Sequence, residues 1–329
     1  MAGALLEVRG LKTYFDTRRG PVKAVDGISY DVMPGEIVAL VGESGCGKTV
    51  SALSLLRLIP EPPGRIWAGE AIFEGHDLLK MNKEEIRQIR GRKISVVFQE
   101  PMTSLNPVFT IGRQITETMI EHKVVEKENA NAEAVRLLDL VGIPDPERLK
   151  QYPGQFSGGM RQRVMLAMAL SCTPSLIIAD EPTTAVDVTI QAQLLELLAS
   201  MVERLNAAVM LITHNLGMVA KYANRVNVMY AGRIVEQATC DEVFANPAHP
   251  YTRMLLNCSP RMDRDRQTKL IPIDGQPPDL VRRPRGCPFH PRCYCAKEIC
   301  KKEWPPLIEV SKNHTSACPY CDEVNEIGK

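Results

Sequence analysis

Short apolar runs alternate with longer helical stretches along the central part of the chain. Ile37–Val41, Leu176–Ala179 and Ala208–Thr213 are continuous apolar runs of strand length, which is typical of parallel strands buried on both faces. Thr49–Leu58 and Met160–Leu170 have helical periodicity instead. Strands that alternate with helices in this way predict an α/β fold built on a parallel sheet.

The pattern changes at three places, and these changes suggest the domain organisation. Residues 5–41 alternate and turn like β-structure, and a largely helical piece over about 102–163 interrupts the α/β alternation. Near residue 240 the composition shifts towards proline, cysteine and arginine. We therefore expect an α/β domain over residues 1–245 with an inserted helical subdomain, followed by a small, irregular, Cys-rich extension over 246–329.

Composition narrows the class of protein. The chain has 329 residues, of which 44% are hydrophobic and 24% are charged, as in a globular protein with a sizeable core. Its 40 basic and 39 acidic residues nearly balance, which argues against a general electrostatic grip on nucleic acid. No apolar run in the sequence reaches membrane-spanning length, and residues 1–4 lack the basic and apolar character of a signal peptide, so we expect neither feature. We expect it to stay in the cytoplasm and to reach a membrane through a partner.

A glycine-rich loop between a predicted strand and a predicted helix carries the clearest chemistry. The order Gly-Glu-Ser-Gly-Cys-Gly-Lys-Thr directs backbone N–H groups and a helix N-terminus at phosphate oxygens. Lys48 would supply charge to the β- and γ-phosphates, and Thr49 could ligate Mg²⁺. In this context a chance glycine-rich turn is disfavoured. The expected phosphate contacts are Gly42, Ser44, Gly45, Cys46, Gly47, Lys48, Thr49 and Val50.

Two later segments add candidates for the same site. Asp180 and Glu181 follow a buried strand, and the carboxyl end of a parallel strand is where ligands bind. Asp180 could hold Mg²⁺, and Glu181 could activate water. Ser157, Gly158 and Gly159 open a predicted helix and could bind a phosphate there. Taken alone, Asp180 and Glu181 could instead be two solvated acids at the start of a loop. Ser157–Gly159 could likewise be an ordinary loop.

Together these motifs resemble an ATP-binding cassette (ABC) ATPase over roughly residues 5–240. Phe156–Met160 resembles the family's signature motif, although it departs from Leu-Ser-Gly-Gly-Gln at both ends. Phe15 matches the aromatic residue that stacks on adenine, with Tyr14 as the alternative. Gln99 matches the Q-loop, Asp187 the D-loop and His214 the H-loop. The resemblance implies a P-loop NTPase with a RecA-like core and an antiparallel β subdomain.

The family resemblance also implies a mechanism. The signature residues of one subunit complete the phosphate loop of another, so ATP lies at a dimer interface. Water attacks the γ-phosphate in line, without a covalent enzyme intermediate. The residues with implied catalytic roles are Lys48, Gln99, Glu181 and His214, and those implied to ligate Mg²⁺ are Thr49, Gln99 and Asp180.

Several stretches resemble one branch of this family, the dipeptide/oligopeptide importers. They are Val41–Gly45, Phe98–Pro107, Gln155–Arg163, His249–Arg253 and Gly275–Leu280. This resemblance implies two membrane permeases, a second and non-identical ATPase, an extracytoplasmic binding protein, and a place at the cytoplasmic face of the membrane. Nickel-chelate or glutathione import is the alternative within the branch. A soluble ABC ATPase acting on nucleic acid is a more remote alternative.

Six of the ten cysteines fall in the last 43 residues, and such clustering in a reducing compartment indicates metal binding before disulfides. The order of Cys287, Cys293, Cys300 and Cys318 resembles the tail of the importer branch, some members of which bind an iron–sulfur cluster there. We expect these four to hold a 4Fe–4S cluster, with Cys295 and Cys321 as spare ligands. A zinc site and free thiols are the alternatives.

Overall fold

The N-terminal third of the chain contributes an antiparallel sheet with the order β2-β1-β4-β5. Burial alternates along much of its strands, so one face packs inwards and the other meets solvent. The predicted antiparallel β subdomain is therefore present. The strands are β1 (Leu6–Thr17), β2 (Gly20–Val32), β4 (Gly64–Phe73) and β5 (His76–Asp77).

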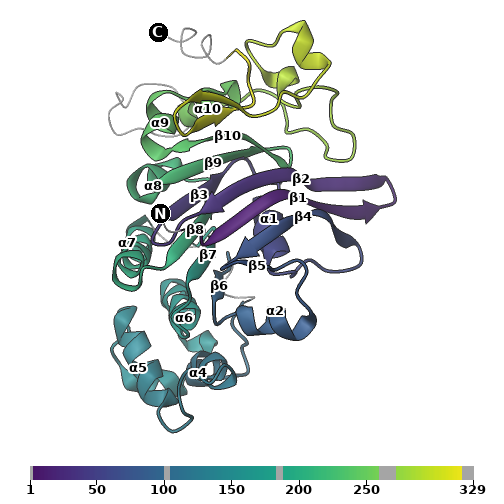
Figure 1. The fold of residues 1–329 in the computed structure, drawn as a ribbon. Coiled ribbons are helices and arrows are strands. Elements are labelled where there is room, and N and C mark those ends of the chain that lie inside the picture. Colours follow the sequence, from purple (N-terminus) through teal and green to yellow (C-terminus); the bar gives the residue numbers. More distant parts are fainter. Residues whose placement is uncertain (1–2, 100–103, 183–187, 259–271, 321–329) are drawn as a thin grey trace. The chain divides into compact units, whose positions relative to one another are not determined.

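The computed structural model describes residues 3–99, 104–182, 188–258 and 272–320, and Figure 1 shows the fold of these residues. Two compact units can be recognised. Unit 1 comprises residues 1–32, 38–79 and 212–329, and unit 2 comprises residues 33–37 and 80–211. The division into these two units does not test the domain boundaries expected from the sequence, 1–245 and 246–329, which stay a prediction.

Unit 1 continues in a second sheet segment with the order β11-β12-β10-β9-β3. Strand β3 pairs in parallel with β9, which pairs antiparallel with β10. The strands are β3 (Ile37–Val41), β9 (Arg225–Tyr230), β10 (Arg233–Thr239), β11 (Ile308–Ser311) and β12 (His314–Ser316). The helices are α1 (Lys48–Leu55), α8 (Leu216–Tyr222), α9 (Cys240–Ala245) and α10 (Pro250–Asn257).

The extension after α10 shares the hydrophobic core of unit 1. Phe289 and Ala317 pack in one buried cluster with Val41 and Val228, which lie on the central strands. Strand β12 adds to the sheet beside β10, with Ser316 opposite Glu236 (Figure 1). Otherwise the described part of the extension is mostly irregular, as expected, with the short 3-10 helices η3 (His290–Arg292) and η4 (Glu298–Lys301).

Unit 2 has its own strands, β8-β7-β6 in order, with β6 and β7 parallel. The strands are β6 (Ile94–Val97), β7 (Leu176–Asp180) and β8 (Ala208–Thr213), whose last two residues fall in unit 1. The helices are α2 (Lys83–Ile89), α4 (Ile111–Glu121), α5 (Ala130–Leu140), α6 (Gly158–Leu170) and α7 (Val188–Leu205), with the 3-10 helices η1 (Pro146–Lys150) and η2 (Pro153–Gln155).

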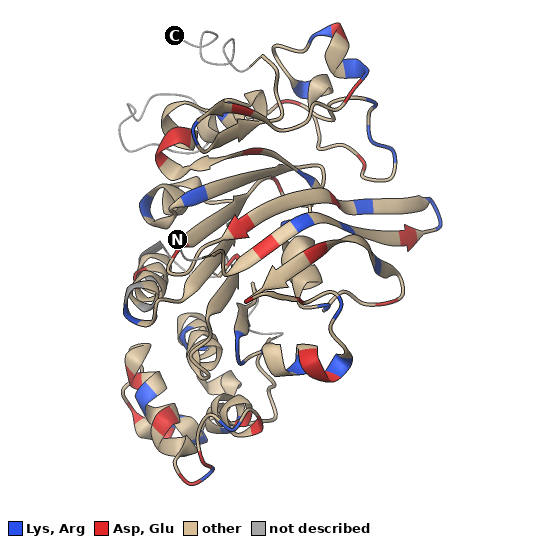
Figure 2. Cartoon of the chain, in the orientation of Figure 1, with Lys and Arg blue, Asp and Glu red and all other residues tan. Residues whose placement is uncertain are grey.

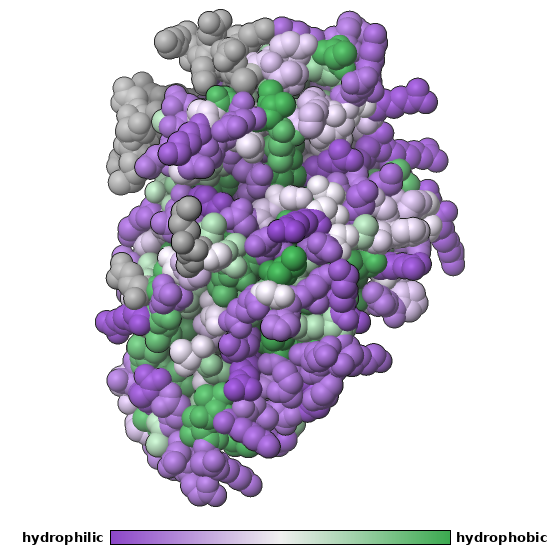
Figure 3. Space-filling model, in the orientation of Figure 1, coloured by the Kyte–Doolittle hydropathy of each residue, from purple (hydrophilic) through white to green (hydrophobic). Residues whose placement is uncertain are grey.

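Lys and Arg are interspersed with Asp and Glu along the elements drawn in Figure 2. On the face shown in Figure 3, apolar areas are interrupted by hydrophilic side chains. None of the helices in the described ranges combines the length and the apolar character that crossing a membrane requires.

Candidate nucleotide-binding site

The predicted phosphate loop joins β3 to α1, and its glycines have the left-handed backbone conformation that this path needs. Gly42, Gly45 and Gly47 have φ angles of 151°, 79° and 106°. A Cβ atom on Gly42 would lie 2.2 Å from the carbonyl oxygen of Met229, and one on Gly47 would lie 2.1 Å from that of Ala24. These two positions therefore require glycine for space as well as for φ.

Lys48 is the first residue of α1, and its side chain turns back over the loop. Its Nζ donates hydrogen bonds to the carbonyl oxygens of Gly42 at 2.8 Å and Glu43 at 3.1 Å. Only 5% of the residue is exposed, whereas Ser44, Gly45 and Thr49 are exposed. The loop thus holds an ammonium group against its own carbonyls and leaves Ser44, Gly45 and Thr49 accessible, whereas Gly42, Cys46 and Gly47 are buried.

Cys46 contributes its backbone to the loop and its side chain to the interior. Its carbonyl oxygen accepts a hydrogen bond from the N–H of Gly232 at 2.9 Å, which ties the loop to the turn between β9 and β10. The thiol is buried, and burial raises its pKa. A neutral buried thiol has no role in ATP chemistry, so any contribution of Cys46 comes from its backbone.

The two candidates for the adenine-stacking residue differ in their surroundings. The hydroxyl of Tyr14 donates to Asp26 Oδ1 at 2.5 Å, and its ring packs against Trp67 with centroids 5.8 Å apart. Burial and the contact with Asp26 raise the pKa of Tyr14 to about 12. Phe15 is half-buried beside Gly64. Because Tyr14 is engaged in a polar network, Phe15 remains the better candidate.

In unit 2 the parallel pairing of β6 and β7 brings predicted residues together at the carboxyl ends of these strands. Gln99 follows β6, Glu181 follows β7, and Gln99 Nε2 donates a 3.0 Å hydrogen bond to Glu181 Oε2. Asp180 is the last residue of β7 and is 5% exposed. Glu181 has a φ of 44°, a strained value for a residue with a side chain, and such strain often marks functional positions.

The predicted signature residues open helix α6, also in unit 2. Ser157 is its N-cap, and Ser157 Oγ accepts a 3.3 Å hydrogen bond from the backbone N–H of Met160. Ser157 and Gly158 are exposed, whereas Gly159 is buried. This is an accessible helix start of the kind that binds anions.

Two predicted residues remain to be placed. His214 directly follows β8 and is exposed. Asp187 lies outside the described residues, as does Cys321. The donor set proposed for Mg²⁺ consists of the Thr49 hydroxyl, the Gln99 amide oxygen and the Asp180 carboxylate. These are all oxygen donors, which is the type that Mg²⁺ prefers.

The prediction of a 4Fe–4S cluster is wrong. Within the part of the chain that the structure describes, no group of three or more His, Cys, Asp or Glu side chains is placed to hold a metal ion. Cys318 is buried and Cys287 and Cys293 are half-buried, and this burial raises the pKa of all three thiols, that of Cys318 to about 12. Cys293 Sγ instead lies 3.6 Å from Cys295 Sγ.

The zinc alternative has no more support, because the described residues offer no group of three or more such side chains to zinc either. None of the nine cysteines in the described ranges forms a disulfide. Cys287, Cys293, Cys295, Cys300 and Cys318 line a small pocket together with His249 and Phe289. The clustering read from the sequence is therefore also a clustering in space.

Two residues that sequence reasoning did not assign contact the phosphate loop. Tyr251 and Arg292 come from α10 and the extension, and both bind Glu43 of the loop. Each belongs to a stretch that resembles the importer branch, and this resemblance was the signal in the sequence that could have pointed to them. The sequence alone did not reveal that these stretches meet.

Comparison with known proteins agrees with this site and fold. The family described as "ABC transporter" matches residues 25–184, and "Oligopeptide/dipeptide transporter, C-terminal region" matches residues 235–300. The dipeptide transport ATP-binding protein DppD of Bacillus subtilis (strain 168) is 49% identical over 320 residues, which are 97% of this chain and 95% of that protein. The oligopeptide transport ATP-binding protein OppD of the same strain is 49% identical over 311 residues, 94% of this chain and 87% of that protein.

A solved structure supports the fold. A dimeric ATP-binding cassette in a post-hydrolysis state, bound to ADP and Pi, matches 71% of this chain and 98% of its own length, with 23% identity and a TM-score of 0.65. The expected α/β P-loop fold and the family resemblance are confirmed. The chain belongs to the family of ABC transporter ATP-binding proteins, ATPases coupled to transport, that carry the oligopeptide/dipeptide transporter C-terminal region.

Proposed function

We propose that this chain binds ATP with Mg²⁺ at the phosphate loop and hydrolyses it to energise uptake of dipeptides or oligopeptides. The observation that carries the catalytic part is the hydrogen bond between Gln99 and Glu181 beside Asp180. It gathers an amide and two carboxylates at one sheet edge, as water activation requires. The names of the full-length relatives, which are dipeptide and oligopeptide transport proteins, support the peptide part.

The proposed roles follow from the chemistry of each group. Lys48 and the loop N–H groups stabilise charge on the phosphates, and Phe15 packs on the adenine. Glu181 orients the attacking water, and Gln99 holds the Glu181 carboxylate in place. His214 contacts the γ-phosphate. When bound through Thr49, Gln99 and Asp180, Mg²⁺ neutralises charge on the β- and γ-phosphates.

The site is completed by a second subunit in this proposal. Ser157, Gly158 and Gly159 of one chain reach the phosphates held by the other, together with Asp187. Two permeases, a second and non-identical ATPase, and an extracytoplasmic binding protein form the rest of the transporter, with this chain at the cytoplasmic face of the membrane. Nickel-chelate and glutathione import are the competing substrate classes.

Reconstitution of the complete transporter in proteoliposomes tests the proposal. Labelled dipeptide should accumulate in an ATP-dependent way, and unlabelled tripeptide should compete, whereas a nickel chelate and glutathione should compete weakly. Glu181→Gln in this chain should stop uptake. Stronger competition by the chelate or by glutathione would replace peptide as the substrate while leaving the ATPase assignment intact.

A further inference from the structure

Three sequence stretches that distinguish the importer branch lie together beside the phosphate loop. Glu43 is the second residue of the loop, Tyr251 lies in α10, and Phe289 and Arg292 lie in the extension. None of these residues is used by the ATPase chemistry proposed above. All four belong to unit 1, so their contacts lie within one compact unit.

Arg292 makes a bidentate ion pair with the carboxylate of Glu43. Its Nη1 lies 2.7 Å from Oε2, and its Nη2 lies 2.9 Å from Oε1. The side chains are 6% and 23% exposed, so water screens the pair poorly. The Nε of Arg292 donates to the carbonyl oxygen of Asp274 at 2.9 Å, which holds the guanidinium in this orientation.

Tyr251 binds the backbone at the same residue. The N–H of Glu43 donates a 2.8 Å hydrogen bond to the hydroxyl oxygen of Tyr251, which is fully buried. Phe289 packs edge-on against Tyr251 and Tyr230, with ring centroids 5.3 Å and 5.2 Å apart. The extension thereby packs against the ring of Tyr251, whose hydroxyl contacts the loop.

The Tyr251 contact bears directly on Lys48. The peptide unit between Gly42 and Glu43 donates its N–H to Tyr251 and accepts the Lys48 ammonium on its carbonyl oxygen at 2.8 Å. Because a peptide unit is planar, the hydrogen bond on one side sets the direction of the carbonyl on the other. Tyr251 therefore controls the group that holds Lys48.

The contact with Arg292 changes the net charge that Glu43 brings to the phosphate loop. An ionised carboxylate in a phosphate-binding loop repels the anion that the loop must bind. Arg292 neutralises the Glu43 carboxylate and holds it in one position through two parallel hydrogen bonds.

We infer that Arg292 and Tyr251 are positioning residues for the phosphate loop, so that the extension takes part in ATP binding. Arg292 neutralises Glu43, and Tyr251 orients the peptide that holds Lys48. This inference rests on the proposed assignment of Gly42–Thr49 as the phosphate site. A role for the extension that is limited to folding would not predict effects that depend on the charge of Glu43.

Binding of the fluorescent analogue mant-ATP with Mg²⁺ to the full chain tests this inference. We expect Arg292→Gln to raise the Kd about tenfold, since a hydrogen-bonded charge loses its partner. The double variant Glu43→Gln/Arg292→Gln should bind within about threefold of the parent, because it removes the unpaired carboxylate as well. Tyr251→Phe keeps the ring and should raise the Kd about fivefold by leaving the Glu43 N–H unpaired.

Two further variants separate the possible failures. Arg19→Gln removes a different contact of the extension, the 2.5 Å pair between Arg19 and Asp279, and should leave the Kd unchanged. Lys48→Ala should abolish binding. If Lys48→Ala loses binding while Arg292→Gln and Tyr251→Phe match the parent, the positioning role is refuted and the phosphate site stands. If Lys48→Ala binds mant-ATP normally, the positioning role and the assignment of the phosphate site are both refuted. If Arg292→Gln does not fold, the Kd values of Tyr251→Phe and of the double variant test the positioning role instead.

Discussion

His314 Nε2 lies 2.8 Å from Oε1 of the fully buried Glu236, and this contact joins β12 of the extension to β10. The same carboxylate accepts the backbone N–H groups of Ala248 at 2.7 Å and His249 at 2.9 Å. Glu242 Oε2 lies 3.7 Å from His314 Nδ1. The hydrogen bond to Glu236 raises the pKa of His314, despite the opposing effect of burial. The extension is therefore attached through a charged, pH-dependent contact.

The His314 contact predicts that the attachment weakens in alkaline solution. A histidine whose pKa is raised on folding contributes fully below its ordinary value of 6.5, and the contribution is lost as pH rises through the folded value. In the parent, the denaturation midpoint, followed by tryptophan fluorescence, should decrease as the pH is raised from 6 to 9. His314→Gln should remove this part of the pH dependence. An identical pH profile in the two proteins would contradict the prediction.

His249 predicts a pH dependence of opposite sign. Burial lowers its pKa to about 3, so it is neutral when folded, and its Nδ1 accepts the N–H of Tyr251. Its stabilising effect is complete above the ordinary value of 6.5 and declines as pH falls towards 3, by at most about 1.4 kcal/mol per pH unit. His249→Asn, which keeps an acceptor for the helix, should flatten the acid limb of the stability curve, whereas His314→Gln should not.

Asp26 anchors a buried network that predicts a large loss of stability. Arg283 Nη1 and Arg233 Nη2 lie 2.8 and 3.0 Å from its Oδ2. Burial alone would raise the pKa of Asp26, but Tyr14 and the two arginines lower it to about 2. Asp26→Asn should lower the free energy of unfolding by about 3 kcal/mol, because it leaves the mostly buried Arg283 and the partly exposed Arg233 without a counter-charge. Urea denaturation measures this change, and Glu7→Gln, in the exposed pair with Arg9, should cost under about 0.5 kcal/mol.

The sequence was most informative where apolar runs are buried on both faces. Ile37–Val41 and Ala208–Thr213 are strands with the predicted bounds, since every residue in them is buried and no register choice is needed. The largely helical piece expected over about 102–163 consists of several separate helices, among them α4, α5 and the 3-10 helix η1. Lys123 with a φ of 53° and Gly142 with a φ of 76° interrupt the helical path after the first two.

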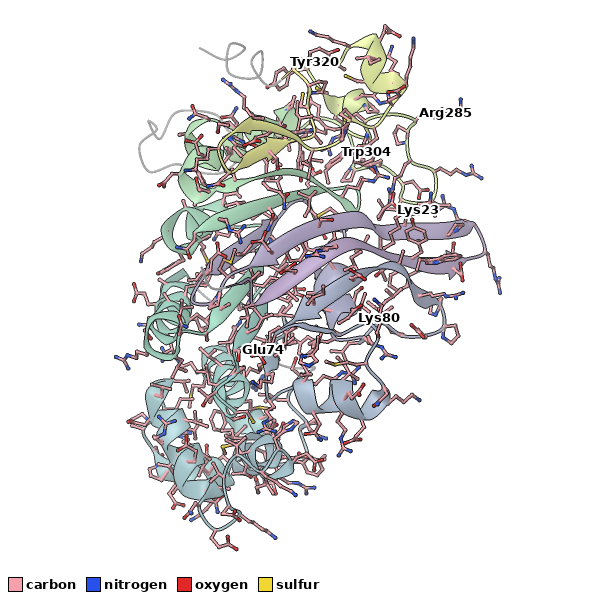
Figure 4. All side chains as sticks on the ribbon, in the orientation of Figure 1. Lys23, Glu74, Lys80, Arg285, Trp304 and Tyr320 are labelled. Atoms are coloured by element: carbon pink, nitrogen blue, oxygen red, sulfur yellow. The ribbon has the colours of Figure 1, made fainter. Side chains whose placement is uncertain are left out.

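The extension shows what spacing could not predict. Cysteine positions along an irregular segment do not tell where the thiols point, and here Cys293 approaches Cys295, which was expected only as a spare ligand. The contact of Arg292 with Glu43 joins residues 249 positions apart, and no local pattern encodes such a pairing. Trp304, labelled in Figure 4, likewise lies against Arg233 of β10, with the guanidinium 4.2 Å from its ring. The motifs identified the chemistry, whereas the packing of the extension needed the structure.

Two glycines of the phosphate loop provide a matched test of its geometry. Gly45 and Gly47 both have positive φ, but only a Cβ on Gly47 would meet backbone, 2.1 Å from the carbonyl oxygen of Ala24. Gly47→Ala must displace the loop and should weaken ATP binding by more than about a hundredfold. In Gly45→Ala the added Cβ meets no other atom, but the positive φ strains the backbone at a cost of about 1–2 kcal/mol. This variant should therefore bind ATP more tightly than Gly47→Ala. Equal Kd values for the two variants would show that the close approach to Ala24 is unimportant.

Glu181 provides the sharpest test of the catalytic assignment. Glu181→Gln keeps an oxygen that can accept the Gln99 hydrogen bond and removes the charge that would activate water. We expect the turnover number of the assembled transporter to fall by about a thousandfold, while ATP binding stays within a few-fold of the parent. Glu74→Gln is the matched control, because Glu74 also follows a strand with a positive φ of 48° but lies in unit 1, between β4 and β5 (Figure 4). Steady-state ATPase assays with mant-ATP binding measure both quantities. Undiminished hydrolysis in Glu181→Gln, or an equal loss in Glu74→Gln, would remove Glu181 from its proposed role.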